Sequence, residues 1–384
     1  MLFLHIIKDE KFIDSAYDLF ETAAPSCNYF VLPDTQNTIK HLKKVKPKRV
    51  SFFSYLNPFF LRSLRRYDAI FLHSLNQFAL ELVARADSRV RFIWIGMGCD
   101  YYDLVFENPF DKLEIKTAQL VRECIPDYEK KQPAGFIKRN AKKLLYPNLS
   151  KKKQIVNKID YFCPVLKSEF KILECLIPGF SPKLLDWNYG KLSKHLDSLP
   201  PPSSDPCFKI LVGNSASPNN NHIDAFELIK NARLPKNYEI IVPLSYGEER
   251  YREAIIRAGY SAFGDHFRPI TDFMPLQDYL DLLASCSATV MNHRRQQAGD
   301  NISASLALGH RLFINKKNAF YDEYTRNGAY IYDIKNLESH PDLLKEPLPK
   351  HQKEKNRDIV QSLSSWEKKL SKTREVIAIT SGSK

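Results

Sequence analysis

Polar and basic side chains gather in one loop in the second half of the chain, between a predicted strand and a predicted helix. Residues 292–303 read Asn-His-Arg-Arg-Gln-Gln-Ala-Gly-Asp-Asn-Ile-Ser. The Asp or Asn of this loop can cap the helix, whose free N–H groups and dipole favour a diphosphate. Arg295 can form a fork to phosphate, and the two glutamines suit sugar hydroxyls. A solvated loop with a routine cap is the less favoured interpretation. The predicted contacts of a sugar nucleotide here are Arg295, Gln296, Gln297, Asn301 and Ser303.

Two further loops at predicted strand ends supply small, amide and aromatic residues. Parallel sheets bind ligands beyond the carboxyl ends of their strands. Gly213, Asn214 and Ser215 close one strand, where small residues let a phosphate approach the backbone. Tyr246 follows the next strand and can stack on a base or a sugar. Ordinary turn chemistry explains both loops equally well. We assign all four residues to the predicted donor site.

Candidates for a catalytic base lie at strand ends in the first half. Residues 94–102 read Trp-Ile-Gly-Met-Gly-Cys-Asp-Tyr-Tyr. Asp100 can take the proton of an acceptor hydroxyl, and His73 ends another predicted strand at the same edge. A glycine turn with Asp100 as a helix cap is an equally good interpretation, and a lone histidine is more often structural. The predicted acceptor contacts are Trp94, Gly98 and Tyr102.

Short apolar runs that alternate with helical patterns must position these loops. In the first half, strands are predicted at 2–7, 29–32, 69–73, 91–95 and 161–165, and helices at 12–22 and 76–86. In the second half, strands at 208–213, 238–243, 288–292 and 311–315 alternate with helices at 223–231, 248–258, 276–285 and 302–308. This alternation favours parallel sheets with crossover helices. The predicted fold class is therefore α/β with two Rossmann-like domains.

A proline-rich segment separates the two halves. Residues 199–206 read Leu-Pro-Pro-Pro-Ser-Ser-Asp-Pro, which neither a helix nor a central strand can accommodate. We predict a domain at 1–198, a linker at 199–206 and a second domain at 207–350. Residues 351–384 have helical spacing over most of their length, and we predict that they pack back toward the first domain.

The positive charge of the chain is concentrated in two runs. The net charge is +13, and residues 40–66 hold nine Lys or Arg with no acid, while residues 138–158 hold eight. Aromatic and aliphatic residues are interleaved with both runs. Such a surface suits an anionic membrane, nucleic acid being the competing partner and a solvated face the third interpretation.

The remaining composition limits other classes of function. The seven cysteines form no C-x-x-C pair, so disulfides and a structural zinc site are not expected. No apolar stretch approaches a membrane span, no signal-peptide pattern is present, and we expect a cytoplasmic protein. No zinc-protease motif and no D-x-D motif occur, so we expect no metal or other cofactor beyond the co-substrate. The dinucleotide-binding and P-loop glycine patterns are also absent.

At these motifs the sequence resembles glycosyltransferase family 56, the fucosamine transferases of enterobacterial common antigen synthesis. The resemblance spans about residues 70–330, and its ordered series of motifs is more specific than any single one. In the second half it covers 210–215, Asn220, 222–223, Val242-Pro243 with Tyr246, Tyr251, 258–259, 279–283, Arg295-Gln296-Gln297 and 315–320. In the first half it covers His73, a W-x-x-x-G-x-D-x-Y pattern at Trp94, Gly98, Asp100 and Tyr102, and Tyr146-Pro147.

The resemblance implies a GT-B fold, in which two Rossmann-like domains face a cleft, and an inverting, metal-independent reaction. It implies that the second domain binds the donor, dTDP-linked 4-acetamido-4,6-dideoxygalactose in the family, and that the first binds an acceptor saccharide on a lipid diphosphate. One departure follows Gln297, where the family has a glycine-rich turn and this chain reads Ala-Gly-Asp-Asn. Asp300 would repel a neighbouring diphosphate, which implies a different phosphate contact or donor.

The leading hypothesis is transfer of a deoxyamino sugar or related hexose to a lipid-linked or lipopolysaccharide, O-antigen-like acceptor at the inner membrane. The protein would then be peripheral on that membrane, with no nucleic-acid partner. A basic adaptor of membranes or nucleic acid is the second hypothesis, and a sugar-nucleotide epimerase with the GT-B fold is the third. An adaptor needs no polar loops at strand ends, and an epimerase needs no basic–aromatic runs.

Overall fold

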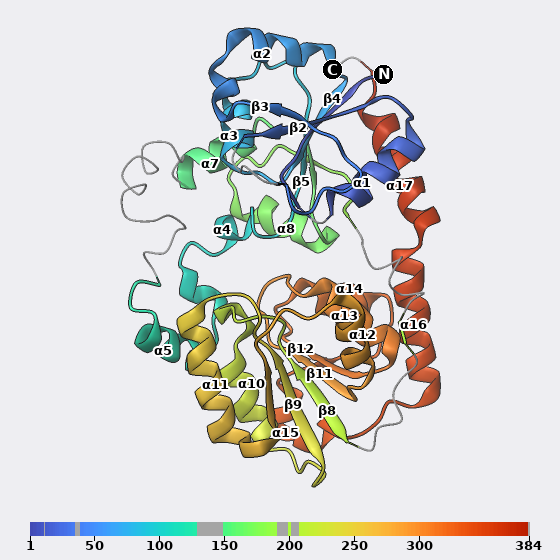
Figure 1. Cartoon of the computed structure of the whole chain (residues 1–384). Coiled ribbons are helices and arrows are strands. Elements are labelled where there is room, and N and C mark those ends of the chain that lie inside the picture. The colour runs from blue at the N-terminus through green and yellow to red at the C-terminus, as the bar shows by residue number, and fades with distance from the viewer. Residues whose placement is uncertain (11, 35–38, 129–148, 190–198, 201–206, 383–384) are drawn as a thin grey trace. The chain divides into compact units, whose positions relative to one another are not determined.

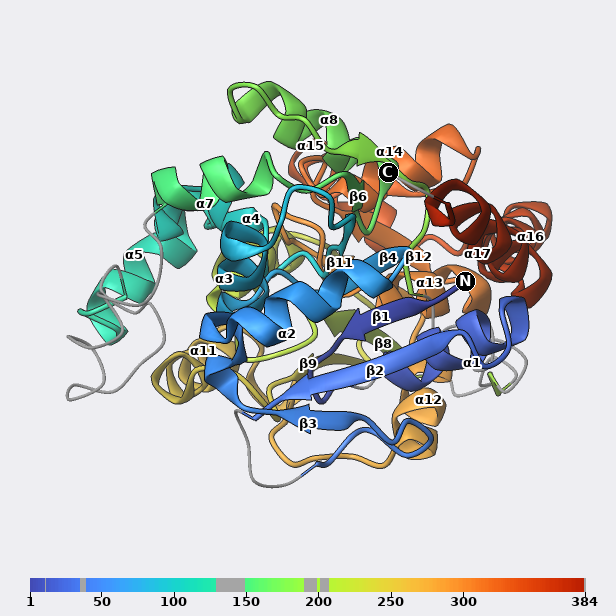
Figure 2. The same ribbon diagram turned by 90° about the horizontal axis from the view of Figure 1, so that it is seen from above.

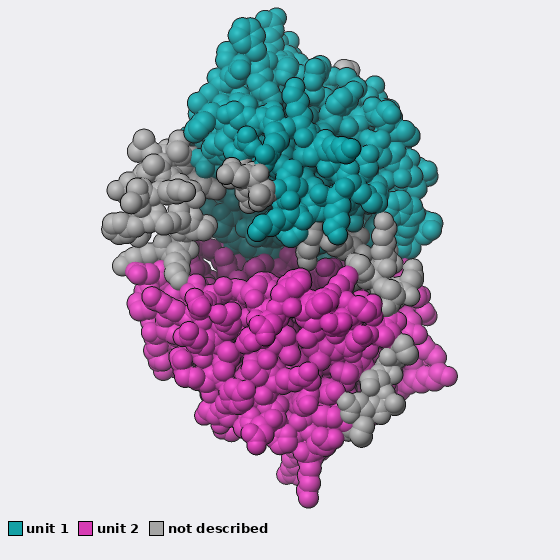
Figure 3. Space-filling model, in the orientation of Figure 1, with its two compact units in different colours: residues 1–105, 133–191, 365–384 teal, residues 106–132, 192–364 magenta. Residues whose placement is uncertain are grey.

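The computed structural model describes residues 1–10, 12–34, 39–128, 149–189, 199–200 and 207–382. Two compact units make up the chain, and Figure 3 shows each in its own colour. Unit 1 comprises residues 1–105, 133–191 and 365–384, and unit 2 comprises 106–132 and 192–364. Most of the proline-rich segment and the first part of the basic run at 138–158 lie outside the described residues.

Unit 1 is built on a parallel sheet whose strand order is β3-β2-β1-β4-β5-β6-β7 (Figure 1). Its chain order is β1 Phe3–Ile6, α1 Ile13–Ala23, β2 Asn28–Pro33, β3 Lys48–Val50, η1 Phe52–Leu56, α2 Pro58–Ser63, η2 Leu64–Arg66, β4 Ala69–His73, α3 Gln77–Arg85, β5 Phe92–Ile95, α4 Tyr102–Val105, α7 Leu149–Val156, β6 Tyr161–Cys163, α8 Lys167–Leu176, β7 Lys183–Leu184 and α17 Trp366–Thr380. The central strands are apolar and buried on both faces, as parallel sheets covered by helices require.

Unit 2 holds a second parallel sheet with the order β10-β9-β8-β11-β12-β13. Its chain order is η3 Pro109–Lys112, α5 Ile115–Cys124, β8 Phe208–Val212, η4 Pro218–Asn220, α10 His222–Lys230, β9 Tyr238–Pro243, α11 Glu249–Phe263, η5 Gly264–His266, β10 Phe267–Ile270, α12 Leu276–Ala284, β11 Ala288–Met291, α13 Gly299–Leu308, β12 Arg311–Ile314, α14 Ala319–Arg326, β13 Tyr332–Asp333, α15 Asn336–Ser339, η6 Pro341–Leu344 and α16 Lys350–Ser364. The α/β fold class with two Rossmann-like units is therefore confirmed.

Residues 106–132 belong to unit 2, whereas the sequence placed them in the first domain. Ala118 and Val121 of α5 pack into the core of unit 2, which also contains Phe226. The Asp224 carboxylate accepts hydrogen bonds from the first N–H groups of α5, at 3.0 and 2.9 Å. An amphipathic pattern shows that one helix face is buried but not which sheet it covers, so the proline-rich segment was the only boundary visible in the sequence.

The tail predicted as one packed helix consists of two helices, one in each unit. α16 packs on α13 within unit 2. Ser365 then starts α17 by accepting a hydrogen bond from the Lys368 N–H at 3.2 Å. Within unit 1, α17 lies beside α1 (Figures 1 and 2), and the Trp187 indole donates to the Thr373 hydroxyl at 2.8 Å. The serine cap divides the tail, because its extended backbone interrupts the helix.

Candidate functional site

The strand order of unit 2 identifies one edge position where a ligand site is expected. β8 is followed in the sheet by β9 and β10 on one side, and by β11, β12 and β13 on the other. The order therefore reverses between β8 and β11. Open parallel sheets bind ligands at such a reversal, outside the carboxyl ends of the two strands. The loops that begin at Gly213 and Asn292 leave these two strand ends, so the predicted donor residues on them converge.

Asn214 is the hub of a hydrogen-bonded cluster at this position. Its Oδ1 lies 3.1 Å from His293 Nε2 and accepts from Gln297 Nε2 at 3.2 Å. Its Nδ2 donates to the Tyr246 hydroxyl oxygen at 3.2 Å. Three strand-end loops thus meet on one amide, and the pattern fixes the His293 tautomer with its proton on Nε2. We name these four residues the Asn214 cluster.

Burial keeps His293 of this cluster neutral. Its side chain is fully buried, and burial together with the Arg295 charge holds its pKa well below the ordinary value. The sequence singled out neither His293 nor its contact with Asn214. Its position directly after a strand, within a loop already assigned to the donor, was the available signal.

The two glycines in these loops are required by geometry. Gly213 has φ +69°, and a Cβ there would lie 2.6 Å from both Asn220 Oδ1 and His222 Nε2. Gly247 has φ +132°, and a Cβ would lie 2.5 Å from the backbone of Ala216. Only glycine fits such close approaches at positive φ. The predicted role of Gly213 thus includes shaping the turn that presents Asn214.

The amino end of α13 offers unpaired backbone donors beside the Asn214 cluster. Ala298 precedes the helix at φ +61°, and none of the described side chains caps the first turn. The first N–H groups of a helix have no partner inside it, and the dipole there favours anions. The Arg295 guanidinium, next to this turn, donates to the Gln296 carbonyl at 2.9 Å. Asp300 is exposed in the same turn.

Three predicted donor residues are engaged inside unit 2. Ser215 is buried and its hydroxyl accepts from Asn220 Nδ2 at 3.2 Å. The Ser303 hydroxyl bonds the Gly299 carbonyl at 2.9 Å and lies 2.6 Å from the Tyr324 hydroxyl. Asn301 Nδ2 donates to the Tyr279 hydroxyl at 2.8 Å. These contacts favour supporting roles for the three side chains, whose assignment to the donor stays a prediction.

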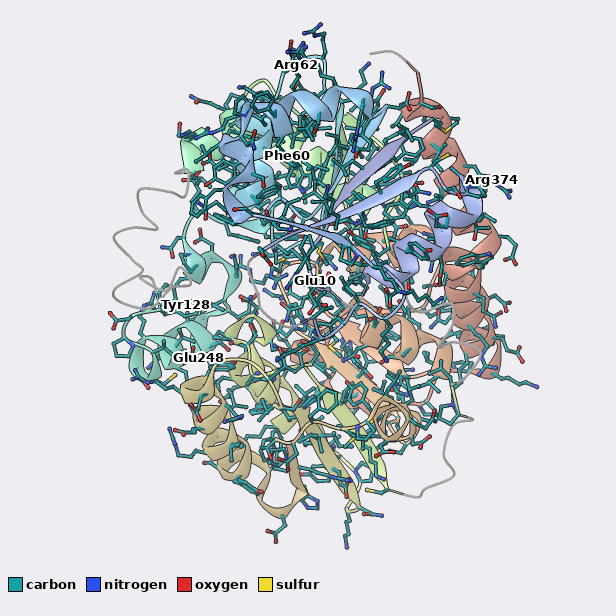
Figure 4. The ribbon with its side chains drawn as sticks, turned by 45° about the horizontal axis from the view of Figure 1, so that its top comes forward. Glu10, Phe60, Arg62, Tyr128, Glu248 and Arg374 are labelled. Atoms are coloured by element: carbon teal, nitrogen blue, oxygen red, sulfur yellow. The ribbon has the colours of Figure 1, made fainter. Side chains whose placement is uncertain are left out.

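Two further residues lie near Arg295 that the sequence did not indicate. Tyr128 and Glu248 belong to unit 2 and are labelled in Figure 4. Burial raises the pKa of Tyr128 to about 12, against an opposing effect of the Arg295 charge and with a contribution from Glu248. Electrostatic effects of this kind decay with distance, so Arg295 and Glu248 each lie in the surroundings of Tyr128. Tyr128 follows α5, which the sequence had assigned to the other domain.

In unit 1, the Asp100 carboxylate is occupied by three N–H donors. Oδ2 accepts from the Trp94 indole and from the Leu75 N–H, both at 2.8 Å, and Oδ1 accepts from the Met97 N–H at 2.8 Å. The side chain is only 7% exposed. It therefore ties the loop after β4 to the loop after β5. This geometry speaks against Asp100 as a general base and favours a positioning role.

The other residues of the W-x-x-x-G-x-D-x-Y pattern are also structural in their contacts. Trp94 and Tyr102 are buried. Gly98 has φ +82°, which lets the loop turn back so that its carbonyl accepts from the Tyr102 N–H at 3.0 Å. Their contact with an acceptor stays a prediction. Their described contacts explain the pattern as a set of residues that fixes the loop after β5.

His73 belongs to a buried chain of polar side chains. His5 Nε2 lies 3.3 Å from Asn28 Oδ1, His5 Nδ1 lies 3.0 Å from His73 Nε2, and His73 Nδ1 lies 2.5 Å from the Tyr189 hydroxyl. Asn28 Nδ2 donates to Glu21 at 3.0 Å, which fixes its oxygen toward His5. Both histidines then donate from Nε2 and accept at Nδ1, so the Tyr189 hydroxyl donates to His73.

These hydrogen bonds leave His73 without a free nitrogen that could take a proton from a hydroxyl of the acceptor sugar. Burial lowers the pKa of His5 to about 3 and holds the pKa of His73 well below its ordinary value. Both rings are neutral, and each nitrogen has a partner. His73 as the base therefore stays a prediction that its described contacts do not favour. Within the described residues, no three His, Cys, Asp or Glu side chains are grouped to hold a metal ion.

Solved structures with the same architecture are found among glycosyltransferases. A glycosyltransferase from Rickettsia africae matches with a TM-score of 0.63 at 11% identity, over 99% of this chain and 98% of that chain. The Anabaena protein HepE in complex with UDP and glucose matches with a TM-score of 0.61 at 13% identity, over 99% of both chains. The alpha,alpha-trehalose 6-phosphate synthase of Burkholderia multivorans matches with a TM-score of 0.61 at 10% identity, over 99% and 97%. At these identities the likeness shows the fold, which is GT-B.

Residues 185–341 match the family described as 4-alpha-L-fucosyltransferase glycosyl transferase group 56. Fold and family match together define the class of this protein as a glycosyltransferase with the GT-B fold. Within that class the match supports assignment to family 56, as the motifs indicated. The matched segment covers the greater part of unit 2 and includes the whole Asn214 cluster.

Proposed function

We propose that the protein transfers a deoxyamino sugar or related hexose from a nucleoside diphosphate, dTDP in the first instance, to a lipid-linked or lipopolysaccharide saccharide. Unit 2 binds the donor and unit 1 the acceptor, and the transfer inverts the anomeric centre without a metal. The observation that carries the proposal is the Asn214 cluster, at the reversal of strand order and beside the uncapped amino end of α13. The complex of HepE with UDP and glucose supports a nucleotide donor for this fold.

The chemistry of the Asn214 cluster supports this position for the donor. Tyr246 is 60% exposed although its hydroxyl is bonded, so its ring is available to stack on the base. The N–H groups of Gly299 to Asn301 and the Arg295 guanidinium neutralise the diphosphate. Gln297 Oε1 is buried without a partner among the described residues. A buried unpaired acceptor costs about 1–3 kcal/mol, and a sugar hydroxyl can satisfy it.

Exposed aromatic and basic side chains in unit 1 support a membrane-bound acceptor. Phe59 of α2 is 83% exposed, and Phe53 and Leu56 are also exposed. Arg62 lies on the same helix and points away from the unit (Figure 4). Anionic lipid attracts such cations by about 1 kcal/mol each, and the apolar side chains can enter its interface. None of the helices in the described part of the chain is long and apolar enough to cross a membrane.

A donor screen tests the proposed reaction. The full chain is incubated with dTDP-, UDP- or GDP-linked sugars and bacterial membrane extract. The lipid-soluble products are then extracted and their masses are measured by mass spectrometry. We expect a mass increase of one sugar with one class of donor. The Asn214→Ala variant should lose most of this product, whereas Asn231→Ala, which changes an exposed residue of the same unit, should retain it. No product with any donor overturns the proposal.

A further inference from the structure

The strand order of unit 1 also reverses at one place, between β1 and β4. β2 and β3 lie on one side of β1, and β5, β6 and β7 lie beyond β4. The two strands are parallel and in register, from Phe3 opposite Ala69 to Ile6 opposite Leu72. The described residues of the loops that leave their carboxyl ends, 7–10 with 12 and 74–76, therefore flank the position where this sheet is expected to bind its ligand.

The side chains at this reversal are polar and held in place. Lys8 Nζ lies 3.5 Å from the Ser74 hydroxyl, which joins the two loops. Ser74 has φ +78°, an uncommon backbone conformation for a residue with a side chain and one often found at functional sites. The Phe12 ring packs on the Tyr189 ring with centroids 5.7 Å apart, so the end of the loop after β1 is fixed beside the Tyr189 side chain.

Other carboxylates in the strand-end loops of unit 1 are already occupied. Asp9 accepts from the Lys40, His41 and Leu42 N–H groups at 2.6 to 3.1 Å, and these bonds hold its pKa below the ordinary value. Asp100 accepts from three N–H groups, as described above. The oxygens of both carboxylates are therefore already used by N–H donors of the protein.

Glu10 differs from these acids. It is partly buried in the loop after β1 (Figure 4), and among the described residues its carboxylate makes no hydrogen bond or ion pair. Its backbone is nevertheless fixed, because its N–H donates to the Lys8 carbonyl at 2.9 Å and its carbonyl accepts from the Ile13 N–H at 3.2 Å. Phe12, two residues further along the chain, packs on the Tyr189 ring. Burial raises the pKa of Tyr189 well above its ordinary value, and the charges of Asp100, Cys163 and lastly Glu10 add to this effect.

We propose that Glu10, and not Asp100 or His73, is the general base of the transfer reaction. This inference rests on the proposed function. A Glu10 carboxylate oxygen takes the proton of the acceptor hydroxyl while that oxygen forms a bond to the anomeric carbon of the donor. The bond from the anomeric carbon to the diphosphate oxygen breaks, and its electron pair leaves with the nucleoside diphosphate. The proton passes from Glu10 to solvent after the product departs.

The groups around Glu10 can accept a hydrogen bond from a sugar hydroxyl. The Tyr189 hydroxyl donates its hydrogen to His73, so its oxygen can accept but not donate toward a ligand. A Glu10 carboxylate likewise only accepts, and Lys8 of the same loop donates to the Ser74 hydroxyl. A sugar hydroxyl, which donates one proton, fits between acceptors of this kind. Tyr189 is then a positioning residue, and His73 acts through it.

Steady-state kinetics of the full chain, with the donor found active and membrane extract as acceptor, test the assignment. General-base catalysis contributes about 10²–10⁴-fold, so Glu10→Gln should lower kcat/KM by at least about 100-fold. The rise of kcat/KM with pH on the acid side should disappear in this variant. Binding of the free nucleoside diphosphate should stay unchanged, because it contacts unit 2. Glu174→Gln, an exposed carboxamide variant on α8 of the same unit, should behave as the wild type.

The outcomes separate this inference from the proposed function. If the wild type transfers sugar and Glu10→Gln keeps kcat/KM within threefold, Glu10 is not the base and the proposed function stands. If Glu10→Gln loses activity and nucleotide binding together, Glu10 acts on the donor or the fold, which also overturns its role as base. If the wild type transfers no sugar from any donor, the proposed function and the base assignment both fail.

Discussion

The Trp94 indole N–H donates to the Asp100 carboxylate at 2.8 Å, on the same oxygen that accepts from the Leu75 N–H. The bond from Leu75 joins the loops that leave β4 and β5, two neighbouring strands of unit 1. A motif that resembles a catalytic acid in an aromatic setting is therefore a lock between two strand-end loops. Its residues lie at the carboxyl edge of the sheet and hold the loops of that edge in one conformation.

Replacing Asp100 tests the lock. Asp100→Asn keeps the shape but presents an amide N–H₂ group to N–H donors, so we expect a loss of about 2–4 kcal/mol in the free energy of unfolding. Turnover per folded molecule should stay within threefold of wild type. Trp94→Phe removes one of these bonds and also leaves a cavity, because Trp94 is fully buried, so its loss of stability combines both effects. Urea unfolding and initial rates measure the two quantities, and a 100-fold loss of turnover with unchanged stability would restore Asp100 as the base.

The buried histidine pair predicts how the stability of unit 1 depends on pH. All three tryptophans, Trp94, Trp187 and Trp366, lie in unit 1, so their fluorescence follows the unfolding of this unit. Burial lowers the pKa of His5 to about 3 and that of His73 well below 6.5, while both rings take up protons near pH 6.5 once unfolded. The unfolded state thus binds more protons below pH 6.5, and the folded state loses stability as the pH falls.

The expected loss is about 2 kcal/mol per histidine between pH 7.5 and 5. The free energy of unfolding, measured with urea at a series of pH values, should change with pH around pH 5.5. The slope of that change should correspond to about two more protons bound in the unfolded state. His73→Gln should reduce this slope by about one proton, whatever its effect on absolute stability. A free energy of unfolding that does not change between pH 7.5 and 5 would contradict neutral, buried histidines.

Asp300 is expected to weaken donor binding. It is exposed in the first turn of α13, beside the proposed diphosphate position. Asp300→Asn should tighten nucleoside diphosphate binding about two- to fivefold at low salt, and added salt should reduce the gain. The same change should cost about 0.3–1 kcal/mol of stability through the helix dipole. Asp358→Asn, at an exposed position of α16, removes the same charge and should leave binding unaltered. Weaker binding by Asp300→Asn would place the diphosphate elsewhere.

Phe59 is expected to contribute to membrane binding. Burying a phenylalanine side chain in an apolar phase contributes about 1.5–3 kcal/mol. Phe59→Ser should therefore reduce sedimentation with vesicles of mixed phosphatidylcholine and phosphatidylglycerol by about tenfold or more. Phe273→Ser changes an equally exposed phenylalanine in unit 2 and should sediment as the wild type does. Equal losses in both variants, or no binding of the wild type to anionic vesicles, would contradict the proposed membrane binding.

The sequence predicted the central strands because buried parallel strands are continuous apolar runs. The predicted strand at residues 69–73 is β4 as found, whereas β3 and β10 were missed because Lys48, Arg49, Arg268 and Pro269 interrupt the apolar pattern. Asn214 and Tyr246 were predicted, since loops after parallel strands are where ligands bind. The occupation of Asp100 was not predictable, because one of its donors, Leu75, lies in a different loop. The availability of Glu10 was not predictable either, because it depends on which groups of other loops come near its carboxylate.

Binding of dTDP and UDP to the full chain, measured by isothermal titration, tests most directly whether the Asn214 cluster is the nucleotide site. The wild type should bind at least one of them. Tyr246→Ala should weaken that binding about tenfold or more, because base stacking contributes about 1–3 kcal/mol. Tyr260→Ala, on another half-exposed tyrosine of unit 2, should leave it unchanged. Absence of binding to both nucleotides, or equal binding by Tyr246→Ala and wild type, would contradict the account.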